Sequence, residues 1–116
     1  ISNVTEIIME NFSLSKANFT GLKNSVEIAI SSSKIKILED IDTFNELQPS
    51  PAKRKKKPTA DVLEALARKD NSQLLHNLAI SEMFYAFWES QYKKISMLNQ
   101  RVTSMNVLKN IESRNS

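Results

Sequence analysis

Apolar residues recur at helical spacing along the N-terminal part of the chain. The steps between successive members are mostly three, four or seven residues, which places them on one face of a helix. This stripe consists of Val4, Ile8, Phe12, Phe19, Leu22, Val26, Ile30, Ile37, Ile41 and Phe44. Ser15 and Ser33 fall where the same spacing would place an apolar side chain. The pattern predicts one long helix within residues 1–47.

Two further helices are predicted after residue 58. Thr59 or Asp61 can cap a short helix over 60–69, whose apolar side is Val62, Leu63 and Leu66. A long helix over 72–113 follows, with near-heptad spacing. Its main stripe consists of Leu74, Leu78, Tyr85, Trp88, Tyr92, Ile95, Val102 and Met105, and a second set beside it consists of Ile80, Met83, Phe84 and Phe87. The middle of this helix is therefore apolar around much of its circumference.

Residues 48–58 separate the two halves. They contain all three prolines of the chain and the uninterrupted basic run Lys53–Lys57. Proline restricts φ and lacks an N–H group, and adjacent cations repel one another, so this stretch is expected to be a flexible, extended linker. Gly21 is the single glycine, which argues against a β-rich fold. The sequence predicts an all-α protein with three regions: 1–47, 48–58 and 59–116.

The two long helices are expected to pair antiparallel, either as a hairpin or within a bundle or coiled coil formed with other chains. A helix with apolar residues on two sides is normally buried between neighbours. The residues expected to anchor such packing are Ile80, Met83, Phe84, Phe87, Trp88 and Tyr92. They form either an internal core or an interface with another helical subunit, identical or different, and the sequence leaves both alternatives open.

The basic run accounts for the net charge of the chain. The total is +3, from 16 basic and 13 acidic residues, and 16 minus the five of the run leaves 11 basic residues against 13 acidic ones. Lys53, Arg54, Lys55, Lys56 and Lys57, flanked by Pro51 and Pro58, resemble a monopartite nuclear localisation signal. The resemblance implies nuclear localisation and an import receptor that binds the run as an extended strand.

Two other interpretations of the run remain. It could clamp the phosphate backbone of a nucleic acid, since each Lys or Arg can neutralise one phosphate, or it could be a solvated tether. Ser50 stands in Ser50-Pro51-Ala52-Lys53, which resembles the Ser-Pro-x-Lys site of proline-directed kinases. A phosphate there would place about two negative charges beside the basic run.

The sequence contains few residues that are candidates for catalysis or metal binding. The chain has no cysteine, which excludes a thiolate site and a Cys/His dyad, and no Ser/His/Asp set can be assembled convincingly around its one histidine, His76. Glu39, Asp40, Asp42 and Glu46 are expected to form a solvated helix end that pairs loosely with the basic run. No apolar run has the length to span a membrane. No cofactor or small-molecule substrate is expected.

The expected function is therefore that of a non-enzymatic helical scaffold or adaptor subunit of a nuclear multiprotein complex. Complexes of the chromatin, transcription or kinetochore type fit the import-like run, and other helical subunits are the expected partners. The alternative is a small nucleic-acid-binding protein that uses Lys53–Lys57 as its clamp. A steep loss of nucleic-acid affinity with rising salt concentration would distinguish the nucleic-acid-binding protein from the scaffold or adaptor subunit.

Overall fold

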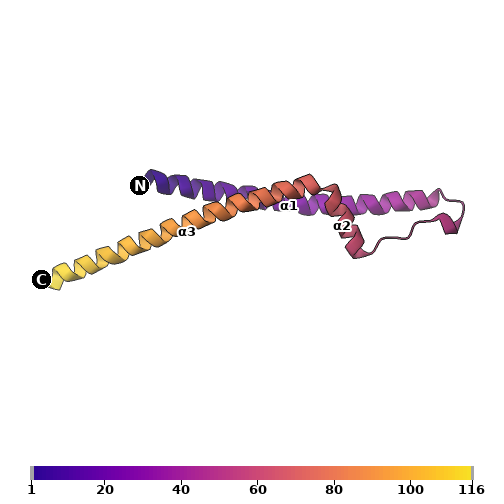
Figure 1. Ribbon diagram of the computed structural model, residues 1–116. Coiled ribbons are helices and arrows are strands. Elements are labelled where there is room, and N and C mark those ends of the chain that lie inside the picture. Colours follow the sequence, from indigo (N-terminus) through magenta and orange to yellow (C-terminus); the bar gives the residue numbers. More distant parts are fainter. Residues whose placement is uncertain (1, 116) are drawn as a thin grey trace. The chain divides into compact units, whose positions relative to one another are not determined.

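The computed structural model describes residues 2–115 and contains three α-helices connected in series (Figure 1). Helix α1 spans Ser2–Glu46, α2 spans Ala60–Asp70 and α3 spans Ser72–Asn115, and one 3₁₀ turn, η1, spans Pro51–Lys53. The described residues contain no strand. The all-α prediction is confirmed, because the long helices α1 and α3 pack together with a short helix between them.

Local hydrogen bonds explain where α2 begins and ends. The Thr59 side chain accepts a hydrogen bond from the backbone N–H of Val62, so Thr59 rather than Asp61 is the N-cap. At the other end, the backbone N–H of Asn71 donates to the carbonyl groups of Arg68 and Lys69. Asn71 therefore separates α2 from α3 without a longer loop.

The linker contains more local structure than an extended chain. Ser50 has extended backbone angles, and Pro51 then opens η1, where its restricted φ suits a helical turn and its missing N–H is not needed. The N–H groups of Lys53 and Arg54 donate to the carbonyls of Ser50 and Pro51, at 3.1 and 3.2 Å. The expected repulsion between cations is thus relieved by the exposure of their side chains rather than by a fully extended backbone.

The chain divides into two compact parts: Phe19–Ile80, and the residues up to Asn18 together with those from Ser81 onward. The first of these holds the most buried residues. Val26, Ile30 and Ala67 are buried, and Leu74, Leu75 and Leu78 pack against them. Ala67 has no exposed surface because its small side chain lets α2 approach α1 closely. This core contains residues from all three helices.

Polar contacts flank the same core. The Asn71 side-chain amide donates to Ser33 Oγ and to the Ala67 carbonyl, each at 2.8 Å. Ser33, which interrupts the predicted apolar stripe, is therefore a hydrogen-bond acceptor for the α2–α3 junction. Lys34 on α1 also forms an ion pair with Glu64 on α2. Both interactions hold α2 and its C-terminal cap against α1 beside the buried core.

The Lys34–Glu64 ion pair predicts a pH-dependent contribution to stability. The hydrogen bond from Lys34 lowers the pKa of Glu64 below its ordinary value of 4.5. Because the folded pKa lies below the unfolded one, the contribution is fully present above pH 4.5 and is lost as the pH falls through the lowered value. We expect Lys34→Gln to reduce the urea midpoint at neutral pH, and the difference from the parent to vanish in strong acid.

The control for this measurement is Lys36→Gln. Lys36 is an exposed lysine on the same helix, and no described residue pairs with it. We expect this variant to match the parent at every pH. A Lys34→Gln deficit that stays constant from neutral pH down to strong acid would show that the lysine acts through packing and not through the ion pair.

The other compact part joins the start of α1 to the middle of α3 through aromatic rings. The Phe12 ring stacks on Tyr92, with centroids 4.8 Å apart and an interplanar angle of 9°, and meets Tyr85 edge-to-face at 5.9 Å. Further along, the Asn18 amide donates to the buried hydroxyl of Ser81 at 3.3 Å. These contacts pair early residues of α1 with later residues of α3, so the two helices run antiparallel here.

Candidate protein interaction site

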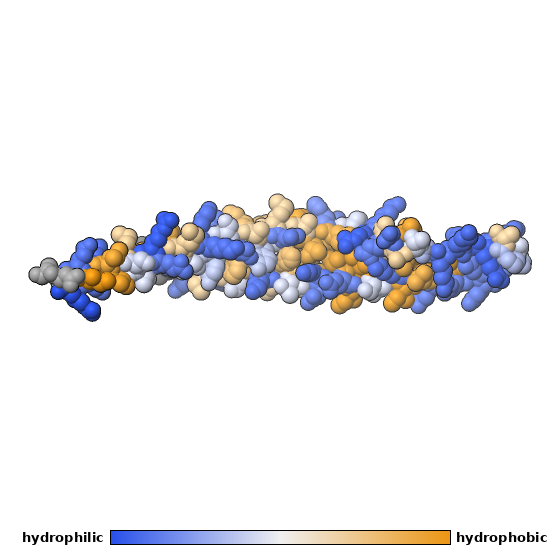
Figure 2. Space-filling model, turned by 90° about the horizontal axis from the view of Figure 1, so that it is seen from below, coloured by the Kyte–Doolittle hydropathy of each residue, from blue (hydrophilic) through white to orange (hydrophobic). Residues whose placement is uncertain are grey.

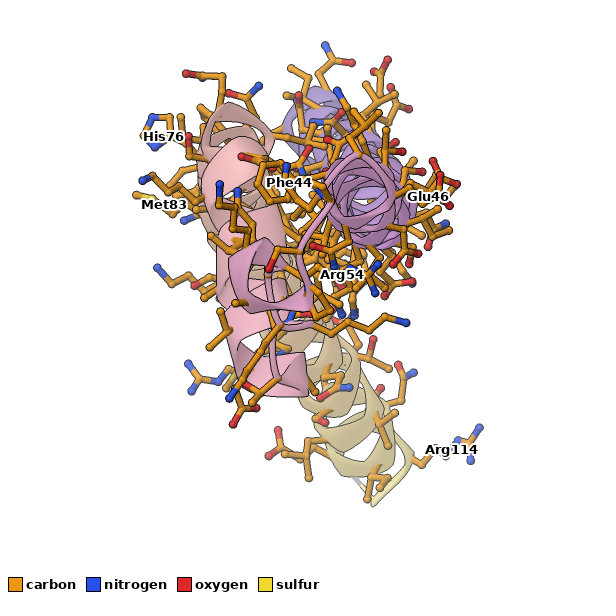
Figure 3. All side chains as sticks on the ribbon, turned by 90° about the vertical axis from the view of Figure 1, so that its right-hand side faces the viewer. Phe44, Glu46, Arg54, His76, Met83 and Arg114 are labelled. Atoms are coloured by element: carbon orange, nitrogen blue, oxygen red, sulfur yellow. The ribbon has the colours of Figure 1, made fainter. Side chains whose placement is uncertain are left out.

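The second apolar set of α3 faces solvent. Met83, Phe84 and Phe87 are 71%, 59% and 52% exposed. Their positions i, i+1 and i+4 place them on one side of the helix, and Figure 3 shows the Met83 side chain projecting outward from α3. We call these three residues the open face. Ile80, predicted together with them, is also exposed and belongs to the other compact part.

Trp88 and Tyr92, the other two predicted anchors, occupy a different environment. Both are half-buried, and Tyr92 stacks on Phe12 of α1. The Trp88 ring contacts Phe87 edge-to-face, with centroids 5.0 Å apart. The structure therefore separates the predicted anchors into one group beside the α1 contact and one group on the surface, and the Phe87–Trp88 pair connects the two groups.

Charged side chains border the aromatic contact. Burial and a hydrogen bond to Glu89 raise the pKa of Tyr85 above its ordinary value. The pKa of Glu89 is lowered, chiefly by its hydrogen bond from Lys93 at 3.0 Å and then by the Tyr85 hydroxyl and the charge of Lys16 on α1. The Tyr85 hydroxyl is therefore protonated and Glu89 ionised at neutral pH. The two groups form a hydrogen bond at the edge of the aromatic contact.

Apolar residues also reach the surface elsewhere. Figure 2 shows hydrophobic residues interspersed with hydrophilic ones along the face in view. Among the described residues only Val26, Ile30 and Ala67 are buried apolar ones. A chain of this size that buries so few apolar side chains offers surface for packing against another molecule.

The basic run is exposed but is held at one point. Asn45, near the end of α1, accepts a hydrogen bond from the Lys55 backbone N–H at 2.8 Å and donates one to the Lys55 carbonyl at 2.9 Å. The Lys55 ammonium group lies 4.4 Å from the centre of the Phe44 ring, a cation–π contact. Lys55 is thus fixed to α1, while the side chains of Lys53, Arg54, Lys56 and Lys57 are exposed.

The carboxylates at the end of α1 lie near this run. Asp42, Asn45 and Glu46 line a shallow hollow together with Arg54. In Figure 3 the Phe44 and Glu46 side chains leave α1 in different directions. Among the described residues no ion pair joins these carboxylates to the basic run. The attachment of the run to α1 therefore depends on the ring of Phe44, which the sequence placed on the apolar stripe, and on the amide of Asn45, which it did not single out.

Ser50 precedes η1 and is partly exposed. Its side chain makes no capping hydrogen bond to the turn that follows. Lys53, three residues later, closes that turn and has an exposed side chain. Ser50 thus lies at the start of the segment that carries the basic run.

Comparisons with protein-family models, with curated proteins and with solved structures give no match to this sequence. Over residues 2–115, no cluster of three or more His, Cys, Asp or Glu side chains is arranged to hold a metal ion. Within the same range, no helix combines the length and the hydropathy that crossing a bilayer requires. The fold and the exposed surfaces are therefore the observations that bear on function.

Proposed function

We propose that the protein is a non-enzymatic helical scaffold or adaptor subunit of a nuclear multiprotein complex, of the chromatin, transcription or kinetochore type. One observation carries this proposal: the exposure of Met83, Phe84 and Phe87 on a helix whose neighbouring aromatic residues already pack on α1. Large apolar side chains grouped on a surface mark sites of protein association.

The open face suits an amphipathic helix of another subunit. Its two phenylalanines are large, have few rotatable bonds and can enter the groove between apolar side chains of a partner helix. Phe87 also contacts Trp88 edge-to-face, so a helix bound there would lie against an aromatic pair whose Trp88 is half-buried.

The basic run supports the nuclear part of the proposal. Four of its five side chains are exposed and without a partner among the described residues, which leaves them accessible to the acidic surface of an import receptor. Binding of the whole run as an extended strand would require the two Asn45 hydrogen bonds to open. A phosphate on Ser50 would oppose that binding by adding about two negative charges nearby.

Nuclear accumulation tests this part of the proposal directly. The chain is fused to a fluorescent reporter too large to diffuse through nuclear pores, and Lys53–Lys57 are all replaced by glutamine. We expect the parent fusion to concentrate in the nucleus and the substituted fusion to remain in the cytoplasm. The matched control replaces five cations outside the run: Lys16, Lys23, Lys36, Lys94 and Lys109. Nuclear accumulation of the Lys53–Lys57 variant, or its absence in the parent, would contradict the proposal.

A further inference from the structure

The C-terminal segment of α3 carries a second exposed apolar surface. Every described side chain from 97 to 114 is exposed. The large apolar ones, each about half exposed, are Met97, Leu98, Val102, Met105, Val107, Leu108 and Ile111. Most helical stability in proteins comes from packing an apolar face and not from helix propensity alone. The segment therefore gains from a neighbour along its apolar side.

One face of this segment has coiled-coil spacing. Leu98, Arg101, Met105, Leu108 and Glu112 follow one another at steps of three, four, three and four residues, which places them on a single seam. We call these five residues the tail face. A shallow hollow beside it is lined by Met97, Gln100, Arg101, Ser104 and Met105, which provides room for a side chain from a neighbouring helix.

The order of residues on the tail face is self-complementary. After Leu98, the tail face consists of Arg101, Met105, Leu108 and Glu112 in that order. The midpoint of these four residues lies between Met105 and Leu108. Turning a second copy end for end about that midpoint places Arg101 opposite Glu112, and Met105 opposite Leu108. Each contact then occurs twice, as two-fold symmetry requires. A parallel pair would instead place Arg101 against Arg101 and Glu112 against Glu112.

We propose that the tail face binds a second copy of this chain, with the two α3 tails antiparallel. The two Arg101–Glu112 pairs set the register and orientation, and Met105 and Leu108 form the apolar centre. The contact uses a different set of residues from the open face, and it does not depend on the proposed function. Arg114 lies on the opposite side of the helix from the seam, so its positive charge does not face the second copy.

Charge reversal tests the proposal on the full chain. Sedimentation equilibrium should show a concentration-dependent dimer for the parent. Arg101→Glu and Glu112→Arg, each alone, should raise the dissociation constant about tenfold, because two attractive pairs become repulsive. The double variant Arg101→Glu/Glu112→Arg should restore the parent value. Arg114→Glu changes the charge by the same amount as Arg101→Glu but lies on the opposite side of the helix from the seam, and should leave the constant within about twofold of the parent.

A spin label tests the orientation. The chain has no cysteine, so Asn99→Cys gives a single attachment point. In the antiparallel register residue 99 lies opposite residue 114, and the two labels are at least about 22 Å apart along the axis at 1.5 Å per residue. Labels in a parallel pair would lie side by side. A parent chain that stays monomeric at millimolar concentration, a dimer unaffected by the single reversals, or closely spaced labels would each overturn the proposal. Loss of partner binding through the open face would leave all three results unchanged.

Discussion

Replacing Phe12 by alanine should lower the free energy of unfolding by about 2–3 kcal/mol. Phe12 is the α1 residue that stacks on Tyr92 and meets Tyr85 edge-to-face. The substitution removes both ring contacts and leaves a gap between α1 and α3 that the helices can close only in part. Urea denaturation followed by circular dichroism measures the loss, with an unchanged slope showing that the folded state is otherwise retained.

Phe84→Ala is the matched control, because the same side chain is removed from the open face of α3. Phe84 is 59% exposed, and no ring contact to it occurs among the described residues. We expect its free energy of unfolding to stay within about 0.5 kcal/mol of the parent. Equal losses for the two variants would mean that α1 and α3 do not pack through the Phe12 side.

The double substitution Met83→Asp/Phe84→Asp should weaken binding to a partner subunit at least about a hundredfold. Truncation of a central apolar anchor commonly costs 2 kcal/mol or more in binding, and two buried carboxylates add a desolvation cost. The partner is first identified by a photoreactive amino acid at Phe87 in nuclear extract. Its purified form is then titrated against the parent and the variant.

Ile28→Asp supplies the comparison for this titration. Ile28 is a similarly exposed apolar residue, 68% exposed, on α1 rather than α3. We expect it to bind the partner with parental affinity. Retention of tight binding by the Met83→Asp/Phe84→Asp variant would contradict the assignment of the open face, even if the chain proves to belong to a complex.

The periodicity of the sequence predicted the helices, and it predicted two apolar sides on α3 without saying which of them packs on α1. Tyr85 and Tyr92 stand on the near-heptad stripe, and the rings of both contact Phe12. That stripe was recognisable because packing between long helices repeats every three or four residues. The second set, of which Met83 and Phe84 are members, was recognised as apolar, but a sequence pattern does not say which of two apolar sides the same chain covers.

Contacts without periodicity could not be predicted. Asn45 holds the backbone of Lys55 ten residues later, and nothing in the type or spacing of these residues distinguishes them from other asparagines and lysines. Ser33 and Ser81 are polar residues within or beside apolar stripes, and each accepts a hydrogen bond from an asparagine distant in sequence: Asn71 at the α2–α3 junction and Asn18 on α1. Such pairs depend on the approach of particular helices, which becomes known only from the fold.

Helix α3 packs on α1 through one side, and we propose that it presents another side for association. Hydroxyl-radical footprinting of the isolated chain tests it most directly, because Phe12 and Phe84 share the same intrinsic reactivity and differ only in their surroundings. We expect Phe84 to be modified several times faster than Phe12, and addition of the partner to protect Phe84 but not Phe12. Equal rates for the two phenylalanines in the isolated chain would contradict this expectation.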